Sequence, residues 1–272
     1  MTVTTIDAFA EGPFTGNPAA VCVLDAPASE AWMQALAAEM NLSETAFLVP
    51  DREATTSRFG LRWFTPTTEV DLCGHATLAS AHLLYESGRL APDAAARFDT
   101  RSGPLSVARL APDTYRMDFP ATPPTASAAP DGFEAAFGVA PAWIGKTRFD
   151  VFAVLDTEAA VRALAPDTGA VAALGARGVI LTARADSDRP YDVVSRFFAP
   201  EAGVPEDPVT GSAHCAIGPY WSRRLGTDRL VAYQASARGG TVGVEVAGDR
   251  VALSGRAVTM YTAQLANVAL PS

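Results

Sequence analysis

The sequence predicts an α/β protein of two similar domains, each with strands around a buried helix. One pattern occurs twice, at residues 62–76 and 196–213: a strand, a proline stop, an acidic loop and a helix-opening glycine. A run that is too apolar for a surface helix follows the first copy at 76–84, and a run with an apolar beginning follows the second at 213–225. The length of 272 residues also suits two domains better than one small core.

The repeat is visible residue by residue. Its first copy reads Arg62-Trp63-Phe64-Thr65-Pro66 and closes with Gly74-His75-Ala76, whereas the second reads Arg196-Phe197-Phe198-Ala199-Pro200 and closes with Gly211-Ser212-Ala213. A helix that opens at such a glycine leaves backbone N–H groups without intrahelical partners, and these groups attract anions. We therefore expect the two helix ends to face each other across a cleft.

The first half begins with strands and a helix. Residues 2–9 alternate as in a strand, and a turn-rich loop then leads to an apolar strand at 19–24. Ser29 is expected to cap a helix that runs to Met40, and strand character resumes at 45–49.

The second half is expected to repeat this plan after a linker. Proline and small residues at 120–130 cannot hold regular structure, and they separate a domain of residues 1–120 from one of residues 131–272. The strand, helix, strand order of the first domain recurs at residues 148–155, 157–164 and 178–183. The final run at 257–265 alternates like a strand and could return to either sheet, that of the first domain included.

Composition excludes several classes of partner. A net charge of −9 disfavours nucleic acid and anionic membranes, since both require a basic face. No run approaches the roughly 18 apolar residues of a membrane span, and the first ten residues do not read as a signal peptide. The three cysteines are an odd number, which fits a reducing compartment. We expect a cytoplasmic protein.

Glu44 is the sharpest candidate for acid or base chemistry. It sits at a helix-to-strand corner beside Leu42 and Ala46-Phe47. Apolar neighbours would disfavour its ionised form and bring its proton affinity toward the range useful for catalysis. A solvent-facing loop glutamate is the ordinary alternative, and local sequence does not decide between them.

Two histidines invite opposite interpretations. His75 follows Cys73-Gly74 at the start of an apolar helix, where the helix dipole disfavours the protonated ring and leaves a neutral imidazole for hydrogen bonding or proton transfer. The alternative is a histidine that merely caps the helix. His82 lies inside the same helix and is expected to be a satisfied core residue.

The second half offers a different set of polar residues. Asp207-Pro208-Val209-Thr210-Gly211-Ser212 combines an acid, a turn and two hydroxyl groups, and the Gly211 and Ser212 N–H groups with the Ser212 hydroxyl could hold a carboxylate. Ordinary helix capping explains the same composition. Asn17, in the loop Thr15-Gly16-Asn17-Pro18, could face a ligand because Gly16 permits close backbone approach, although turn formation explains it equally well.

The sequence predicts no metal and no cofactor. No pair of histidines or cysteines has the spacing of a structural zinc site, and Cys73 with His75 would need distant partners. The glycine-rich nucleotide fingerprints are absent as well.

Together these segments closely resemble the PhzF-like family, which is named for phenazine biosynthesis. The matching pieces, in chain order, are Asp7-Ala8-Phe9, Gly16-Asn17-Pro18-Ala19-Ala20-Val21, Leu42-Ser43-Glu44-Thr45-Ala46-Phe47, Arg62-Trp63-Phe64-Thr65-Pro66 through Glu69 to Cys73-Gly74-His75-Ala76-Thr77, and Glu206-Asp207-Pro208-Val209-Thr210-Gly211-Ser212-Ala213-His214. Their order and spacing span nearly the whole chain, so the resemblance is specific.

The resemblance implies a fold and an activity. The fold is the diaminopimelate-epimerase-like one, two domains that each wrap a mostly antiparallel sheet around a central helix, with the active site between them. The activity is a cofactor-independent isomerisation, usually by a homodimer, and the founding substrate is trans-2,3-dihydro-3-hydroxyanthranilate. Glu44 matches the glutamate that moves the proton. His75, Asp207 and Ser212 match positions that bind the substrate's amino and carboxylate groups or assist the proton transfer.

Two other functions remain open on the sequence. A racemase or epimerase of the same fold uses two cysteines on opposite faces of an amino-acid α-carbon, and Cys73 occupies the first of these places. The second half argues against that reaction, since Thr210 is the counterpart of Cys73 and Cys215 lies inside the helix. A non-catalytic protein that binds a small carboxylate is the other alternative, although a nearby glutamate would oppose anion binding.

Overall fold

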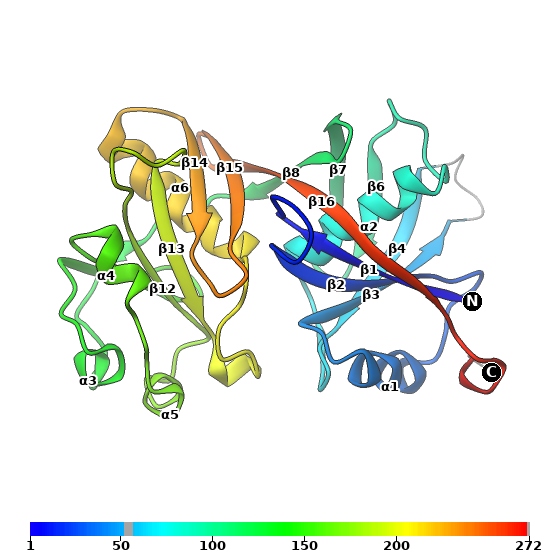
Figure 1. Cartoon of the computed structure of the whole chain (residues 1–272), viewed down its shortest axis with the longest axis horizontal. Helices are drawn as coiled ribbons and strands as arrows, with labels where there is room; N and C mark the ends of the chain where they lie inside the picture. The colour runs from blue at the N-terminus through cyan, green and yellow to red at the C-terminus, as the bar shows by residue number, and fades with distance from the viewer. Residues whose placement is uncertain (52–56, 271–272) are drawn as a thin grey trace. The chain divides into compact units, whose positions relative to one another are not determined.

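The computed structural model describes residues 1–51 and 57–270 (Figure 1). The chain divides into two compact units, one made of Met1–Asp118 with Ser254–Ser272 and the other of Phe119–Leu253. It passes between them twice, in β8 (Thr114–Pro120) and in β16 (Arg250–Gln264). From Ser254 onward β16 belongs to the first unit, where it pairs with β1.

The first unit is a sheet with one helix on each face. Its other strands are β1 (Thr2–Ala8), β2 (Asn17–Val23), β3 (Glu44–Pro50), β4 (Arg58–Phe64), β5 (Glu69–Val70), β6 (Ala96–Thr100) and β7 (Gly103–Ala111). Pairing is antiparallel except between β2 and β3 and between β4 and β6. Helix α2 (Gly74–Glu86) packs against β1, β2 and β3, while α1 (Glu30–Met40) packs against β3 and β4.

Helix α2 is the buried central helix that the sequence predicts. Its side chains are buried from His75 through His82, and Leu84 and Tyr85 are buried as well. The predicted core role of His82 is confirmed, because Nδ1 lies 2.9 Å from the Tyr115 hydroxyl and Nε2 lies 3.0 Å from Oγ1 of Thr259. Both ring nitrogens thus have partners inside the unit.

The second unit repeats this plan. Its other strands are β9 (Thr125–Ala126), β10 (Trp143–Lys146), β11 (Val151–Val154), β12 (Val179–Arg184), β13 (Val193–Phe198), β14 (Arg229–Gln234) and β15 (Gly240–Ala247). Helix α6 (Gly211–Leu225) packs on β14 and β15. The short helices α3 (Phe133–Phe137), α4 (Glu158–Arg162) and α5 (Thr168–Ala172) share a separate apolar cluster with β12. The 3-10 helices are η1 (Pro200–Ala202) and η2 (Asn267–Ala269).

The predicted linker contains regular structure. Strand β9 lies inside residues 120–130 and pairs with β10, Thr125 opposite Lys146 and Ala126 opposite Gly145. The expectation that this segment holds no regular structure was therefore wrong. Its prolines stand outside those two positions, so Thr125 and Ala126 keep the backbone groups that a sheet edge requires.

No helix among the described residues is both long enough and apolar enough to cross a membrane.

Candidate active site

Glu44 and Asn17 reach the α2 face of the first sheet because of strand register. Strands β2 and β3 run parallel and begin at Asn17 and Glu44, and Ala19 is the partner of Glu44. Side chains alternate between the two faces of a strand. Phe47 packs in the cluster under α1, so Glu44, three positions earlier, faces α2. Its side chain is only 16% exposed, so it is not the solvent-facing glutamate of the ordinary alternative.

His75 connects these two residues. Asn17 Nδ2 lies 3.1 Å from Nδ1 of His75, and Glu44 Oε2 lies 3.2 Å from Nε2. Since the amide nitrogen of Asn17 is a donor, Nδ1 is the acceptor and the ring hydrogen stands on Nε2. The imidazole therefore presents an N–H group on the side of Glu44. The structure thus brings Asn17, Glu44 and His75 together in one unit.

Burial keeps His75 neutral. The side chain is 4% exposed, and desolvation lowers its pKa from 6.5 to about 3. The Nε2 hydrogen is not aligned on the Glu44 oxygen, and Nε2 makes no hydrogen bond within residues 1–51 and 57–270. A buried N–H group of this kind is a natural partner for a substrate atom. His75 is therefore more than a helix cap.

Cys73 completes a cluster that could hold a metal ion. Its Sγ lies 3.5 Å from Nδ1 of His75, and the donor atoms of Glu44, Cys73 and His75 lie within 4.8 Å of one another. Cys73 and His75 were expected to need partners from a distant part of the sequence to bind a metal, and β3 brings one such residue, Glu44, beside them. Carboxylate, thiolate and imidazole are all zinc ligands. A metal ion at this cluster would occupy Glu44 and His75 at once.

In the second unit, β14 fixes the loop that carries Asp207. Gln234 is fully buried; it accepts a hydrogen bond from the Thr210 N–H at 2.9 Å and donates to the Asp207 carbonyl at 2.7 Å. The Thr210 hydroxyl donates to Asp207 Oδ2 at 2.5 Å. Asp207 is therefore held through its side chain and its backbone, rather than serving as the N-cap of α6.

Ser212 lies beside a cation that sequence reasoning missed. Arg177 Nη2 donates to Ser212 Oγ at 3.4 Å, and the same guanidinium binds buried Asp150 through two hydrogen bonds of 2.9 and 2.6 Å. These residues lie 35 and 27 positions apart from Arg177, and no local motif announces the pairing. Arg177 adds a fixed positive charge near the start of α6.

The two central helices begin without the side-chain cap that α1, α4 and α5 have. Ser29, Thr157 and Asp167 each accept a hydrogen bond from the first turn of α1, α4 and α5. The N-cap residues of α2 and α6 are Cys73 and Thr210, and neither side chain makes such a bond in the described part of the chain. The first-turn N–H groups that begin at Gly74 and Gly211 are thus available to an anion.

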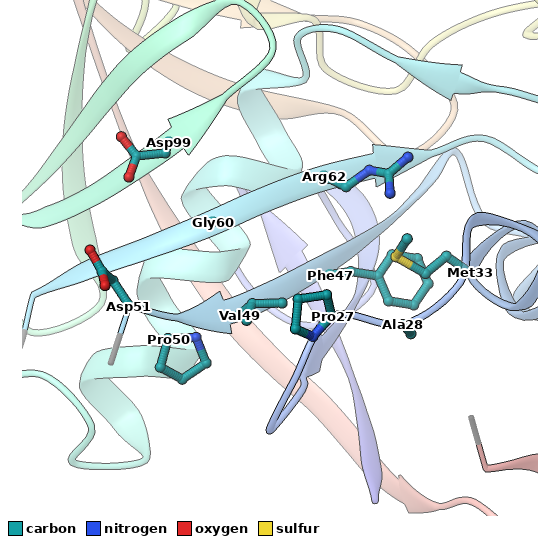
Figure 2. A pocket seen from close by; sticks show the side chains of 10 residues that line it. All are labelled: Pro27, Ala28, Met33, Phe47, Val49, Pro50, Asp51, Gly60, Arg62 and Asp99. Carbon is teal, nitrogen blue, oxygen red and sulfur yellow. The ribbon is translucent and has the colours of Figure 1, made fainter. Parts of the chain in front are cut away.

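A hollow in the first unit lies apart from these residues. It measures about 370 Å³ and is lined by Pro27, Ala28, Met33, Phe47, Val49, Pro50, Asp51, Gly60, Arg62 and Asp99. Figure 2 shows it over β3 and β4, with Phe47 and Met33 at one end and the two carboxylates toward the other. Phe47 belongs to the face that α1 covers, opposite Glu44. None of the predicted site residues lines it.

Known proteins resemble this chain along almost its whole length. The profile of a family described as phenazine biosynthesis-like protein matches residues 6–263. An uncharacterised isomerase of Pseudomonas aeruginosa is 49% identical, with 97% of this chain and 98% of that protein covered. An uncharacterised isomerase of Halalkalibacterium halodurans is 44% identical, with 96% of each chain covered.

A solved structure supports the same assignment. The crystal structure of a PhzF family protein of Enterococcus faecalis has a TM-score of 0.90 and 44% identity, and the match covers 97% of this chain and 99% of that one. The predicted two-domain, epimerase-like α/β fold is confirmed by this likeness. Family profile, relatives and structure agree, and the chain belongs to the phenazine biosynthesis-like (PhzF) family.

Proposed function

We propose that this PhzF-family protein is a cofactor-independent isomerase that moves a proton within a small carboxylate substrate similar to trans-2,3-dihydro-3-hydroxyanthranilate. Glu44 is the general acid and base. The observation that carries the proposal is the 3.2 Å contact between Glu44 Oε2 and Nε2 of a neutral, buried His75. The isomerase names of the two bacterial relatives agree with it.

The reaction follows from these groups. Glu44 removes a proton from one carbon, the electron pair of that C–H bond enters the adjacent π-system, and the same carboxyl group returns the proton to another carbon. Bonds and charges balance, because Glu44 takes up one proton and gives one back. Between the two steps its carboxyl proton exchanges with water, which brings deuterium into the product. Since Nε2 of His75 carries a hydrogen, it can donate to negative charge that develops on the substrate.

The remaining predicted residues bind the substrate. The N–H groups at Gly74 and Gly211 and the Ser212 hydroxyl hold the carboxylate, and Asp207 holds the amino group. Asn17 acts on the substrate through His75. The uncapped starts of α2 and α6 support this assignment, because each leaves donors for an anion. We propose further that the protein acts in a biosynthetic process in the cytoplasm. We also propose that it is a homodimer, and sedimentation would test this oligomeric state.

The test replaces the base. Glu44→Gln keeps the size of the side chain and removes the carboxylate, and Glu39→Gln on the exposed side of α1 is the matched control. With trans-2,3-dihydro-3-hydroxyanthranilate in deuterated water, Glu44→Gln should lose turnover and deuterium uptake by at least about a thousandfold, while the control keeps both. Unchanged turnover in Glu44→Gln would exclude Glu44 as the base.

Two other functions make different predictions. A two-cysteine racemase needs a thiol on α6 that corresponds to Cys73, yet the N-cap there is Thr210, and Cys215 Sγ donates to the Gly211 carbonyl inside the helix. Incubation of single enantiomers of amino acids in deuterated water would reveal that activity. A non-catalytic binding protein would bind anthranilate and show no deuterium uptake in the wild type.

A further inference from the structure

Each unit contains an arginine that binds a glutamate in the loop before its central helix, and the glutamate stands at the same sequence separation from the N-cap in both units. Glu69 stands four residues before Cys73, the N-cap of α2, and Glu206 stands four residues before Thr210, the N-cap of α6. The arginines are Arg62 and Arg196, which open the two copies of the repeated motif. We call each Arg–Glu pair a clamp.

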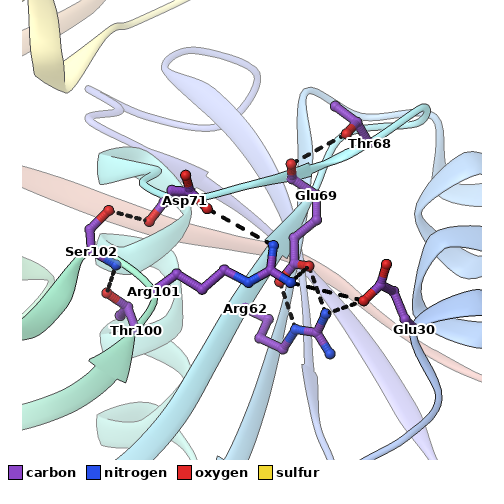
Figure 3. A network of polar contacts seen from close by, with 8 residues as sticks. All are labelled: Glu30, Arg62, Thr68, Glu69, Asp71, Thr100, Arg101 and Ser102. Carbon is purple, nitrogen blue, oxygen red and sulfur yellow. Dashed lines mark hydrogen bonds and ion pairs between the residues drawn. The ribbon is translucent and has the colours of Figure 1, made fainter.

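The first clamp is a bidentate pair. Arg62 donates from Nε and Nη2 to the two oxygens of Glu69, both at 2.6 Å, and its guanidinium lies 5.1 Å from the centroid of Phe64. Figure 3 shows Arg101 reaching the same carboxylate, with Nη2 2.7 Å from Oε2. The Glu69 side chain is only 6% exposed, and its hydrogen bonds with Arg62 lower its pKa.

The loop after Glu69 is tied down a second time. The Ser102 hydroxyl donates to the Asp71 carbonyl at 2.7 Å, as Figure 3 shows. Only Leu72 stands between this contact and Cys73. Glu69 and Asp71 are therefore both held in the loop that leads into α2, whose first turn carries His75.

The second clamp has the same chemistry. Arg196 donates from Nε and Nη2 to the two oxygens of Glu206 at 2.7 and 2.8 Å, and its guanidinium lies 4.9 Å from the centroid of Phe198. In each copy the stacked phenylalanine stands two residues after the arginine. The Asp207 N–H donates to the Phe197 carbonyl at 3.0 Å, so the segment that carries Asp207 is anchored at its beginning.

The two copies differ in the length of the segment between the clamp residues. Seven positions separate Arg62 from Glu69, and ten separate Arg196 from Glu206, where η1 occupies part of the longer loop. The site residues differ too, with His75 on one helix and Ser212 on the other. What the copies share is the arginine, its phenylalanine, the bidentate carboxylate and the distance to the helix. Because these features are the same in both units while the loop lengths and the site residues differ, we infer that they serve one structural purpose in both units.

We propose that Arg62 and Arg196 are positioning residues: each fixes the loop that sets the first turn of its central helix, and through it the candidate site residues of its own unit. The proposal rests on the proposed function for its kinetic consequences. Arg62 controls the placement of His75 and so the chemical step. Arg196 controls Asp207 and Ser212 and so the binding of substrate. A bidentate guanidinium fixes a carboxylate in two dimensions, which a lysine cannot do.

The test uses Arg62→Lys and Arg196→Lys, with Arg58→Lys as the control. Arg58 lies on the same strand as Arg62 and binds Asp99 in the same bidentate way, at 2.6 and 2.9 Å, but it holds no loop before a helix. With trans-2,3-dihydro-3-hydroxyanthranilate, Arg62→Lys should lower kcat about ten- to a hundredfold with little change in KM, since small misplacements of reacting groups have effects of this size. Arg196→Lys should raise KM about tenfold, and Arg58→Lys should match the wild type.

A second measurement separates this proposal from the proposed function. Amide hydrogen exchange, resolved by residue, should become at least about tenfold faster at residues 77–80 in Arg62→Lys and at 215–218 in Arg196→Lys, where the backbone N–H groups begin to bond inside each helix, and in neither segment in Arg58→Lys. This readout needs no substrate, so it judges the clamps even if the wild type fails to turn over the test compound. Wild-type exchange at both helix starts in the two variants would overturn the proposal, and so would equal losses of activity in all three.

Discussion

Asn17 donates a hydrogen bond to Nδ1 of His75 at 3.1 Å, and this contact places the ring hydrogen on Nε2, next to Glu44. The relationship joins residues 58 positions apart. It gives the imidazole a fixed direction and a fixed tautomer before any substrate arrives.

Asn17→Asp should reverse that tautomer. A carboxylate at this position accepts the hydrogen of Nδ1, so Nε2 loses its own and can no longer donate. We expect turnover to fall by about two orders of magnitude or more, and by less in Asn17→Ala, where the ring keeps a choice of tautomer. Nitrogen NMR of the His75 ring reports the tautomer directly. An Asn17→Asp protein with hydrogen still on Nε2 and normal turnover would contradict the assignment.

Stability should fall as the pH drops below the ordinary histidine range. Burial lowers the pKa of His75 to about 3 and that of His214 to about 4, from 6.5. The unfolded chain takes up these protons near pH 6.5 and the folded protein does not, so the free energy of unfolding decreases with falling pH from 6.5 toward those values. The limiting slope is about 1.4 kcal/mol per pH unit for each histidine.

Urea unfolding between pH 7.5 and 5 measures this slope, since most carboxylates titrate lower. His214→Gln should reduce it, because the glutamine does not titrate. If His214→Gln and His75→Gln both kept the wild-type slope, buried histidines would not be the cause of the pH dependence.

Removal of metal ions should leave turnover unchanged. The proposed proton transfer uses Glu44 and His75 themselves, so dialysis against a chelator has nothing essential to remove. Added zinc should inhibit, because the cluster of Glu44, Cys73 and His75 offers three ligands, and Cys73→Ser should weaken that inhibition while it keeps most of the turnover. Turnover that disappears on chelation and returns with zinc would contradict a cofactor-independent reaction.

Gly16→Ala should damage both stability and activity. Gly16 has φ +74°, and a Cβ there would lie 2.4 Å from the Ala8 carbonyl oxygen. Gly88 has φ +69° with nothing within 4 Å, so Gly88→Ala measures the backbone cost alone, about 1 kcal/mol. The overlap at Gly16 should add about 2 kcal/mol and displace Asn17. Denaturant unfolding compares the two variants, and equal losses would mean that the Ala8 contact relaxes freely.

Local sequence was sufficient to predict where most helices and strands lie, but it was insufficient to predict which of them contact one another. The cap at Ser29, the glycines that open α2 and α6, and the uniformly apolar run of α2 are local signals, and each element begins where its signal stands. The strand at Thr125–Ala126 was missed, because its partner lies on a neighbouring strand and not in its own composition.

The candidate site depends even more on distant partners. Glu44 as a base and His75 as a cap were both compatible with their neighbours in sequence, and the contact between them comes from the packing of α2 against β3. No sequence motif marks Arg177. Its role follows from its contacts with Asp150 and Ser212, which are distant in sequence and are brought to it by the fold. The chemical roles of Glu44, His75 and Asp207 stay predictions until their variants are measured.

The path of β16 has a consequence for how the protein is made. Strand β1 has residues 257–264 as one of its two partners, so the first unit lacks one strand of its sheet until those residues have left the ribosome. The second unit, Phe119–Leu253, is synthesised in one continuous stretch before that point. The unit whose synthesis begins later is therefore the first that can close, and β1 waits for a strand that is made only after the whole second unit.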